Sequence, residues 1–87
     1  MIEKVMQIQM NPGLEARPVA VLVQVASKYD CSVYIKSGER KVNAKSIMGM
    51  MSLGLDTGEE VTVIADGLDE KQAVNGIEEY LIKGKVS

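Results

Sequence analysis

Residues able to carry chemistry are few in this chain of 87 residues, because it contains no histidine. Without an imidazole there is no histidine general base, no histidine metal ligand and no histidine to activate a serine or cysteine nucleophile. The one cysteine, Cys31, has no second thiol for a disulfide or a CxxC site. We therefore expect Cys31 to be a small, partly buried hydrophobic residue, and the missing imidazole excludes a large share of enzyme mechanisms.

An acid and a base stand two residues apart in the segment Gly13-Leu14-Glu15-Ala16-Arg17-Pro18. A glutamate such as Glu15 near a helix N-terminus is favoured by the helix dipole, which is a sufficient structural reason for it. The planar guanidinium of Arg17 matches the geometry of a phosphate or a carboxylate. The segment is thus a candidate site for an anion.

A serine, a cation and an apolar run adjoin in the segment Lys45-Ser46-Ile47-Met48-Gly49-Met50-Met51. Ser46 is placed to cap a short helix, where a phosphoryl group would gain from the helix dipole and the free amides of the first turn, with Lys45 as a nearby positive charge. Two turns of helix cannot bury all the apolar side chains here, which are Ile47, Met48, Met50, Met51 and Leu53. Two interpretations stay open: an exposed partner-binding patch, or methionines that fill an irregular core.

Other site patterns are incomplete. Gly49 and Gly54 have the spacing of a phosphate-binding loop, but Leu55 and Asp56 stand where lysine and serine or threonine are required. Six acidic residues lack EF-hand spacing and are interpreted as a solvated face: Asp56, Glu59, Glu60, Asp66, Asp69 and Glu70. We expect neither a metal nor a cofactor.

Composition limits the location and the partners of the chain. A net charge of −2, a pI near 5.0 and three scattered tyrosines disfavour direct binding to nucleic acid. No apolar run is long enough to cross a bilayer, and the N-terminus lacks the features of a secretion signal. We expect a cytoplasmic protein that forms a single domain over residues 1–87.

Two helices must position much of the core. Residues 18–28 are ambiguous, because their valines alternate as in a strand while Leu22 and Ala26 also fall at helical spacing. Pro18 suits the first turn of a helix and the run is long for a strand, so we predict a helix. Asp69 and Gln72 have the spacing of a capping box, which predicts a second helix that ends near Gly84. Its apolar face would be Ala73, Ile77, Tyr80 and Leu81.

The remaining segments predict strands and one short helix. Strands are expected at residues 2–9, 32–36, 39–43 and 60–65, and the short helix from Ser46 to Leu53. The resulting order is β-α-β-β-α-β-α. It predicts an α+β fold in which helices pack on one face of a four-stranded, mainly antiparallel sheet.

At two segments the sequence resembles a known family. Gly13-Leu14-Glu15-Ala16-Arg17-Pro18 is similar to the Gly-Ile/Leu-His-Ala-Arg-Pro motif of HPr, the histidine-containing phosphocarrier of the bacterial sugar phosphotransferase system. Residues 42–54 resemble the regulatory-serine region of its Gram-positive members. The resemblance covers nearly the whole chain. It implies an HPr-like open-faced β-sandwich of four antiparallel strands with three helices on one face, and a helix at residues 18–28.

Glu15 stands where the family has its phosphate-accepting histidine. The resemblance therefore implies that phosphoryl transfer from enzyme I to sugar-transport components is lost, and that the chain has no catalytic residue and is not an enzyme. In lacking this histidine the sequence is similar to the Crh-type branch of the family, in which glutamine occupies the position. Glutamate leaves a second interpretation open, in which Glu15 imitates a permanently phosphorylated histidine with less charge.

The resemblance further implies a regulator of carbon catabolite repression. Ser46 would be phosphorylated by HPr kinase/phosphorylase, and the phosphorylated protein would act as corepressor of the LacI-type catabolite control protein. Arg17 and Lys45 would help read the phosphoryl group. The docking patch would consist of Ile47, Met48 and Met51.

Two further partners are consistent with the resemblance. As an alternative function, the unphosphorylated face around Glu15 and Arg17 would bind and modulate a metabolic enzyme. Crh-type proteins can also exchange their first strand, so a homodimer is allowed, with Asn11-Pro12-Gly13 as the hinge.

Overall fold

The computed structural model describes residues 1–9, 18–53 and 58–83. Its strands are β1 (Ile2–Gln7), β2 (Ser32–Ser37), β3 (Arg40–Asn43) and β4 (Glu60–Asp66). Its helices are α1 (Pro18–Ser27), α2 (Ile47–Leu53) and α3 (Glu70–Glu78), and α3 continues as a π-helix, η2 (Glu79–Lys83). The predicted order of elements is confirmed.

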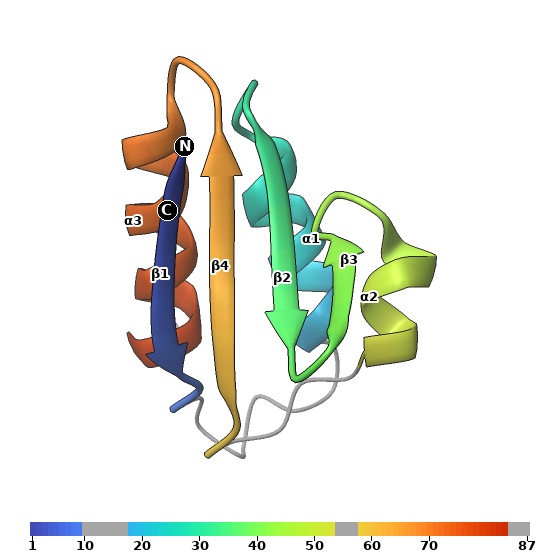
Figure 1. Ribbon diagram of the computed structural model, residues 1–87. Helices are drawn as coiled ribbons and strands as arrows, with labels where there is room; N and C mark the ends of the chain where they lie inside the picture. The colour runs from blue at the N-terminus through green and yellow to red at the C-terminus, as the bar shows by residue number, and fades with distance from the viewer. Residues whose placement is uncertain (10–17, 54–57, 84–87) are drawn as a thin grey trace.

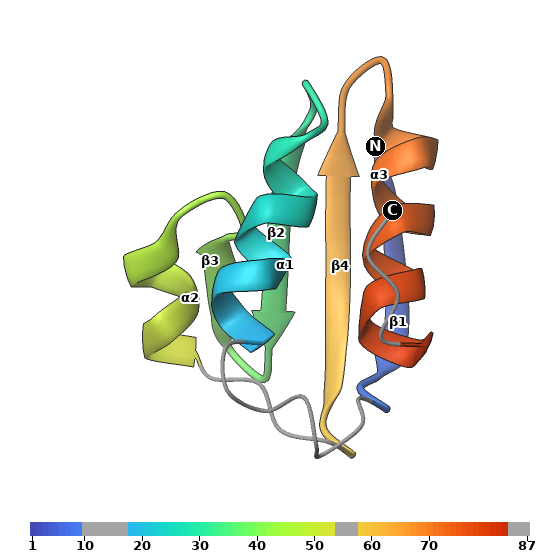
Figure 2. The same cartoon turned by 180° about the vertical axis from the view of Figure 1, so that it is seen from behind.

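The strands form one antiparallel sheet in the order β1-β4-β2-β3. β4 lies between β1 and β2, so that Ile64 pairs with Glu3 on one side and with Tyr34 on the other. All three helices lie on one side of the sheet: Figure 1 looks onto the uncovered side, and Figure 2 onto the helices. The predicted open-faced α+β sandwich is therefore confirmed.

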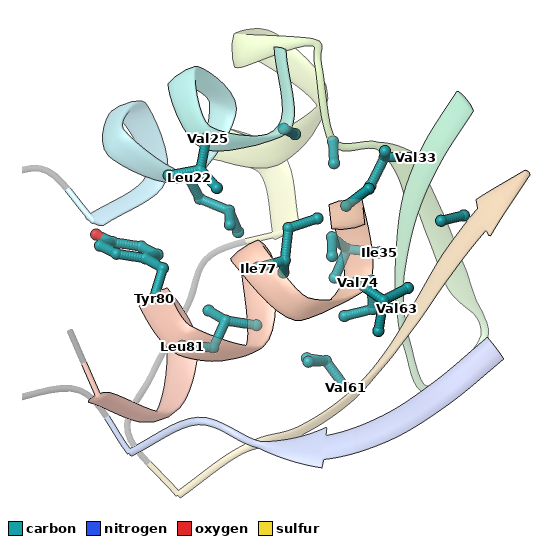
Figure 3. Packing of buried hydrophobic residues seen from close by; sticks show 14 of the residues in the cluster. Leu22, Val25, Val33, Ile35, Val61, Val63, Val74, Ile77, Tyr80 and Leu81 are labelled. Carbon is teal, nitrogen blue, oxygen red and sulfur yellow. The ribbon is translucent and has the colours of Figure 1, made fainter. Parts of the chain in front are cut away.

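The core lies between the sheet and α1 and α3 (Figure 3). The ambiguous segment is a helix, in which Leu22, Val25 and Ala26 are buried at helical spacing. The predicted apolar face of the last helix is also confirmed, since all four of its residues are buried: Ala73, Ile77, Tyr80 and Leu81. Burial of regularly spaced side chains, rather than the local preference of valine for strands, decides the structure of α1.

The predicted capping box at the start of α3 is wrong. The Asp69 side chain makes no cap hydrogen bond to the helix. It instead accepts hydrogen bonds from the backbone amides of Asp30, at 2.8 Å, and Cys31, at 2.9 Å. The bond from the Asp30 amide is the main cause that lowers the pKa of Asp69. The Glu70 side chain reaches back to the Gly67 amide at 3.1 Å. Asp69 thus fastens the loop after α1 to α3.

Cys31 is buried beside Asp69, as the sequence predicts. Desolvation, with a smaller contribution from Asp69, raises the pKa of its thiol to about 11. A thiol that stays protonated at neutral pH is a poor nucleophile. Cys31 is therefore a packing residue of the loop between α1 and β2.

Three backbone hydrogen bonds hold the residues that follow β1. The Ile8 amide donates to the Glu59 carbonyl and the Gly58 amide donates to the Ile8 carbonyl, at 2.9 and 2.7 Å. The Gln9 amide donates to the Leu81 carbonyl at 2.9 Å, within η2. The predicted hinge follows directly, at residues 11–13, and lies outside the described residues.

In residues 1–9, 18–53 and 58–83, no helix is long and apolar enough to cross a bilayer. Nor do these residues bring together three or more acidic or cysteine side chains that could hold a metal ion.

Candidate functional site

Ser46 lies at the turn between β3 and α2, where local hydrogen bonds fix its position. The Asn43 side chain accepts the Lys45 amide at 2.8 Å, and the Asn43 carbonyl accepts the Ser46 amide at 3.0 Å. The hydroxyl of Ser46 accepts the Gly49 amide at 3.3 Å, and its carbonyl accepts the Met50 amide at 3.0 Å. Ser46 is thus the N-cap of α2, as its sequence position predicts.

The surroundings of the Ser46 hydroxyl suit an added anion. Ser46 is only half-buried, and the cap bond from Gly49 is long. The first turn of α2 has no acidic residue to repel negative charge. The first amides of a helix have no partners within it, so phosphate oxygens could accept from them. The arrangement is therefore suited to a phosphoryl group as a substituent of Ser46.

The side chain of Lys45 makes a structural contact within the protein. Its ammonium donates to the backbone carbonyl of Tyr29 at 2.6 Å, in a partly buried contact. Tyr29 follows the C-terminal end of α1, where a cation also interacts favourably with the helix dipole. Lys45 therefore ties the start of α2 to the end of α1. The sequence gives no signal for this contact, because its acceptor is a backbone atom.

Replacing Lys45 with methionine is expected to lower the stability of the folded chain by about 1 to 2 kcal/mol, since it removes a charged hydrogen bond to a partly buried carbonyl. Urea denaturation would measure the change. Lys71→Met is the matched control, because Lys71 is exposed on α3 and should change the stability by less than about 0.5 kcal/mol. Equal stabilities of the two variants would contradict a structural role for the Lys45 ammonium.

The apolar residues of α2 divide between the core and the surface. Met50 is fully buried and Leu53 packs partly against the core. Ile47, Met48 and Met51 are exposed to 43, 81 and 67%. We call these three residues the α2 patch. Met50 therefore fills the core, while the α2 patch is exposed; binding of a partner by the patch stays a prediction.

A contact that the sequence did not indicate holds the far end of α2. The Arg40 guanidinium donates to the Ser52 hydroxyl at 3.1 Å, and this hydroxyl donates to the Gly49 carbonyl at 2.7 Å. Arg40, the first residue of β3, thus connects this strand to α2. Together with the Lys45 contact it fixes both ends of the helix that presents the α2 patch.

Several predicted positions lie outside the described residues. Glu15 and Arg17, the candidate anion-binding pair, belong to residues 10–17. The predicted helix stop Gly54 and the acidic residue Asp56 belong to residues 54–57. The structure brings together Lys45, Ser46 and the α2 patch, while the relation of Glu15 and Arg17 to them stays a prediction.

Nearly the whole chain matches one protein family. Residues 2–83 fit the family described as "PTS HPr component phosphorylation site". The chain belongs to the HPr family. The HPr-like protein Crh of Bacillus subtilis is 43% identical over 81 residues, which cover 93% of this chain and 95% of Crh.

Solved structures of HPr and Crh share the fold. HPr-C-His from Thermoanaerobacter tengcongensis is 42% identical with a TM-score of 0.84, over 93% of this chain and 91% of that one. A crystal structure of Bacillus subtilis Crh, described as a domain-swapped dimer, is 39% identical with a TM-score of 0.72, over 100% of this chain and 94% of that one. This chain is thus similar to members of the HPr family, Crh among them.

Proposed function

We propose that this HPr-family chain is a regulator of carbon catabolite repression that is switched by phosphorylation of Ser46. The observation that carries the proposal is the position of Ser46, which caps α2 directly beside the exposed α2 patch. In the switching reaction, HPr kinase/phosphorylase moves the γ-phosphoryl group of ATP to the Ser46 oxygen, the hydroxyl loses its proton and ADP leaves.

The charge introduced at Ser46 alters recognition without remodelling the fold. A phosphoserine carries nearly two negative charges at neutral pH, and at a helix N-terminus they are stabilised by the dipole and by free amides. The adjoining α2 patch offers apolar surface that a partner can bury. One surface then combines a switchable charge with a constant apolar contact, which supports docking to the LacI-type catabolite control protein as its corepressor.

Arg17 and Lys45 are proposed to help read the phosphoryl group. Arg17 supplies a guanidinium suited to two phosphate oxygens. Lys45 stands next to Ser46, and its bond to the Tyr29 carbonyl fixes the backbone from which Ser46 projects. In this proposal Glu15 lies on the docking surface as well, and the family's histidine chemistry is absent because Glu15 replaces the histidine. The chain acts as a cytoplasmic binding protein and not as an enzyme or a phosphocarrier.

A homodimer formed by exchange of β1 is a further part of the proposal. Crh of Bacillus subtilis forms a swapped dimer. Here β1 pairs along its whole length with β4 alone, at the edge of the sheet. An edge strand can leave and be replaced by the same strand of a second chain, which restores every contact.

Incubation with HPr kinase/phosphorylase and ATP tests the site, with mass spectrometry of the intact protein as the measurement. We expect one added phosphoryl group on the wild type and none on Ser46→Ala. Ser52→Ala is the matched control, because Ser52 is a second hydroxyl on α2 and its variant should still gain the group. An unmodified wild type, or a Ser46→Ala variant that is still phosphorylated, would refute the assignment.

A further inference from the structure

The side of the sheet without helices has an unusual distribution of charge. Side chains alternate along each strand, and those that face the helices form the core. The others form what we call the open face, which Figure 1 views directly. Ile64 belongs to it, since it alternates with the core residues Val63 and Ala65 and is only 7% exposed although it is not part of the core cluster.

The open face is acidic on one half and basic on the other. β1 and β4 contribute Glu3 and Glu60, both exposed, and β2 and β3 contribute the exposed Lys36 and Lys41. Within the described residues, Glu3, Glu60 and Lys36 form no ion pair. The two halves of the sheet thus present opposite charges side by side.

The two lysines face each other across the β2–β3 ladder. Lys36 pairs directly with Lys41, an arrangement of like charges that destabilises a sheet. The ring of Tyr34 lies 4.7 Å from the Lys41 ammonium and offsets part of this cost through a cation–π contact. No carboxylate on the described part of β2 or β3 relieves the repulsion. The pair is suited to a partner surface that brings carboxylates.

We infer that the open face binds the open face of a second copy of this chain. A twofold axis parallel to the strands, between β4 and β2, lays the acidic half of one copy over the basic half of the other. Glu60 then lies near Lys36 of the second copy, and Glu3 near its Lys41. In the middle, Ile64 lies over Tyr34 of the second copy, because both belong to the same row of the sheet.

The charge pattern selects this axis. A twofold axis across the strands would place β1 on β1 and β3 on β3, so the acidic half would lie on the acidic half and the basic half on the basic half. The axis along the strands instead lays each half on the half of opposite charge, with Glu60 one row from Lys36 of the second copy and Glu3 one row from its Lys41. The same surface is self-complementary, as a twofold interface requires.

The size of the open face predicts weak association. Four strands about 4.8 Å apart give a face roughly 20 Å wide, and a contact of roughly 400 Å² per copy is about half that of a standard stable interface. The dimer should therefore form only at high protein concentration and low salt. It differs from exchange of β1, which replaces an edge strand of the sheet and does not require contact between open faces, and it does not depend on Ser46.

Analytical ultracentrifugation of charge-reversal variants tests the inference. The wild type should associate at millimolar concentration in low salt, and about tenfold more weakly in 0.5 M NaCl. Lys36→Glu and Glu60→Lys should each lose this salt-sensitive association, because each brings like charges near one another. An equimolar mixture of the two variants should associate again, since one then supplies carboxylates and the other ammonium groups at both contacts.

The alternatives give different results. A wild type that stays monomeric at millimolar concentration overturns the inference. Association that neither salt nor the single reversals weaken belongs to strand exchange and also overturns it. Loss of association in the single variants without recovery in the mixture contradicts the proposed axis. Circular dichroism of each variant confirms that these exposed substitutions leave the fold intact.

Discussion

Met48→Asp is expected to weaken binding of the Ser46-phosphorylated protein to the catabolite control protein by about 100-fold. Met48 is the most exposed member of the α2 patch, at 81%. Burying a methionine contributes about 1.5 to 3 kcal/mol, and an aspartate in the same contact would be desolvated without a partner. Isothermal titration of the phosphorylated variant would measure the loss, after mass spectrometry has verified its phosphorylation.

Leu68→Asp is the matched control for Met48→Asp. Leu68 is fully exposed, in the turn between β4 and α3, on a different part of the molecule from α2. The substitution Leu68→Asp therefore introduces the same charge as Met48→Asp, also in place of an exposed apolar side chain. We expect its affinity to equal that of the wild type. If Met48→Asp also kept wild-type affinity, the α2 patch would not be the docking surface.

Gly67→Ala is expected to destabilise the chain by about 3 kcal/mol or more. Gly67 has φ = +154°, a conformation that residues with a side chain rarely adopt. An added methyl carbon would also lie 2.7 Å from the Cα atom of Cys31, a backbone atom held in place by the Asp69 carboxylate. Strain and overpacking each cost about 1 to 3 kcal/mol, and neither can be relieved by turning a side chain. Urea denaturation would report the difference.

Gly38→Ala separates strain from overpacking. Gly38 also has a positive φ, of +61°, but an added methyl carbon would meet no atom within 4 Å. We expect it to cost about 1 kcal/mol, from backbone strain alone. If Gly67→Ala were no more destabilising than Gly38→Ala, the close approach of Gly67 to Cys31 would not be a constraint on the fold.

The order of elements could be predicted because periodicity and turn residues act locally. The hairpin through Gly38 and the buried face of α3 are of this kind. The helix α1 was harder, since its valines satisfy both periods and only the burial of Leu22 and Ala26 under the same core decides between them. Pro18, the length of the run and the resemblance to HPr all favour the helix that the structure contains.

Long-range contacts explain what the sequence could not predict. Asp69 has the spacing of a cap, yet it binds amides of residues 30 and 31, which local spacing cannot reveal. The partner of Lys45 is likewise a backbone carbonyl 16 positions away. In contrast, helix geometry predicts that α2 cannot bury all of its apolar residues. It does not predict which of them are exposed.

Titration of the catabolite control protein with phosphorylated and unphosphorylated chain tests the central claim most directly. We predict that phosphorylation at Ser46 tightens binding at least tenfold, equivalent to about 1.4 kcal/mol, and that Ser46→Ala treated with the same kinase keeps the affinity of the unphosphorylated protein. Equal affinities of the phosphorylated and unphosphorylated wild type would contradict a role for Ser46 as the switch.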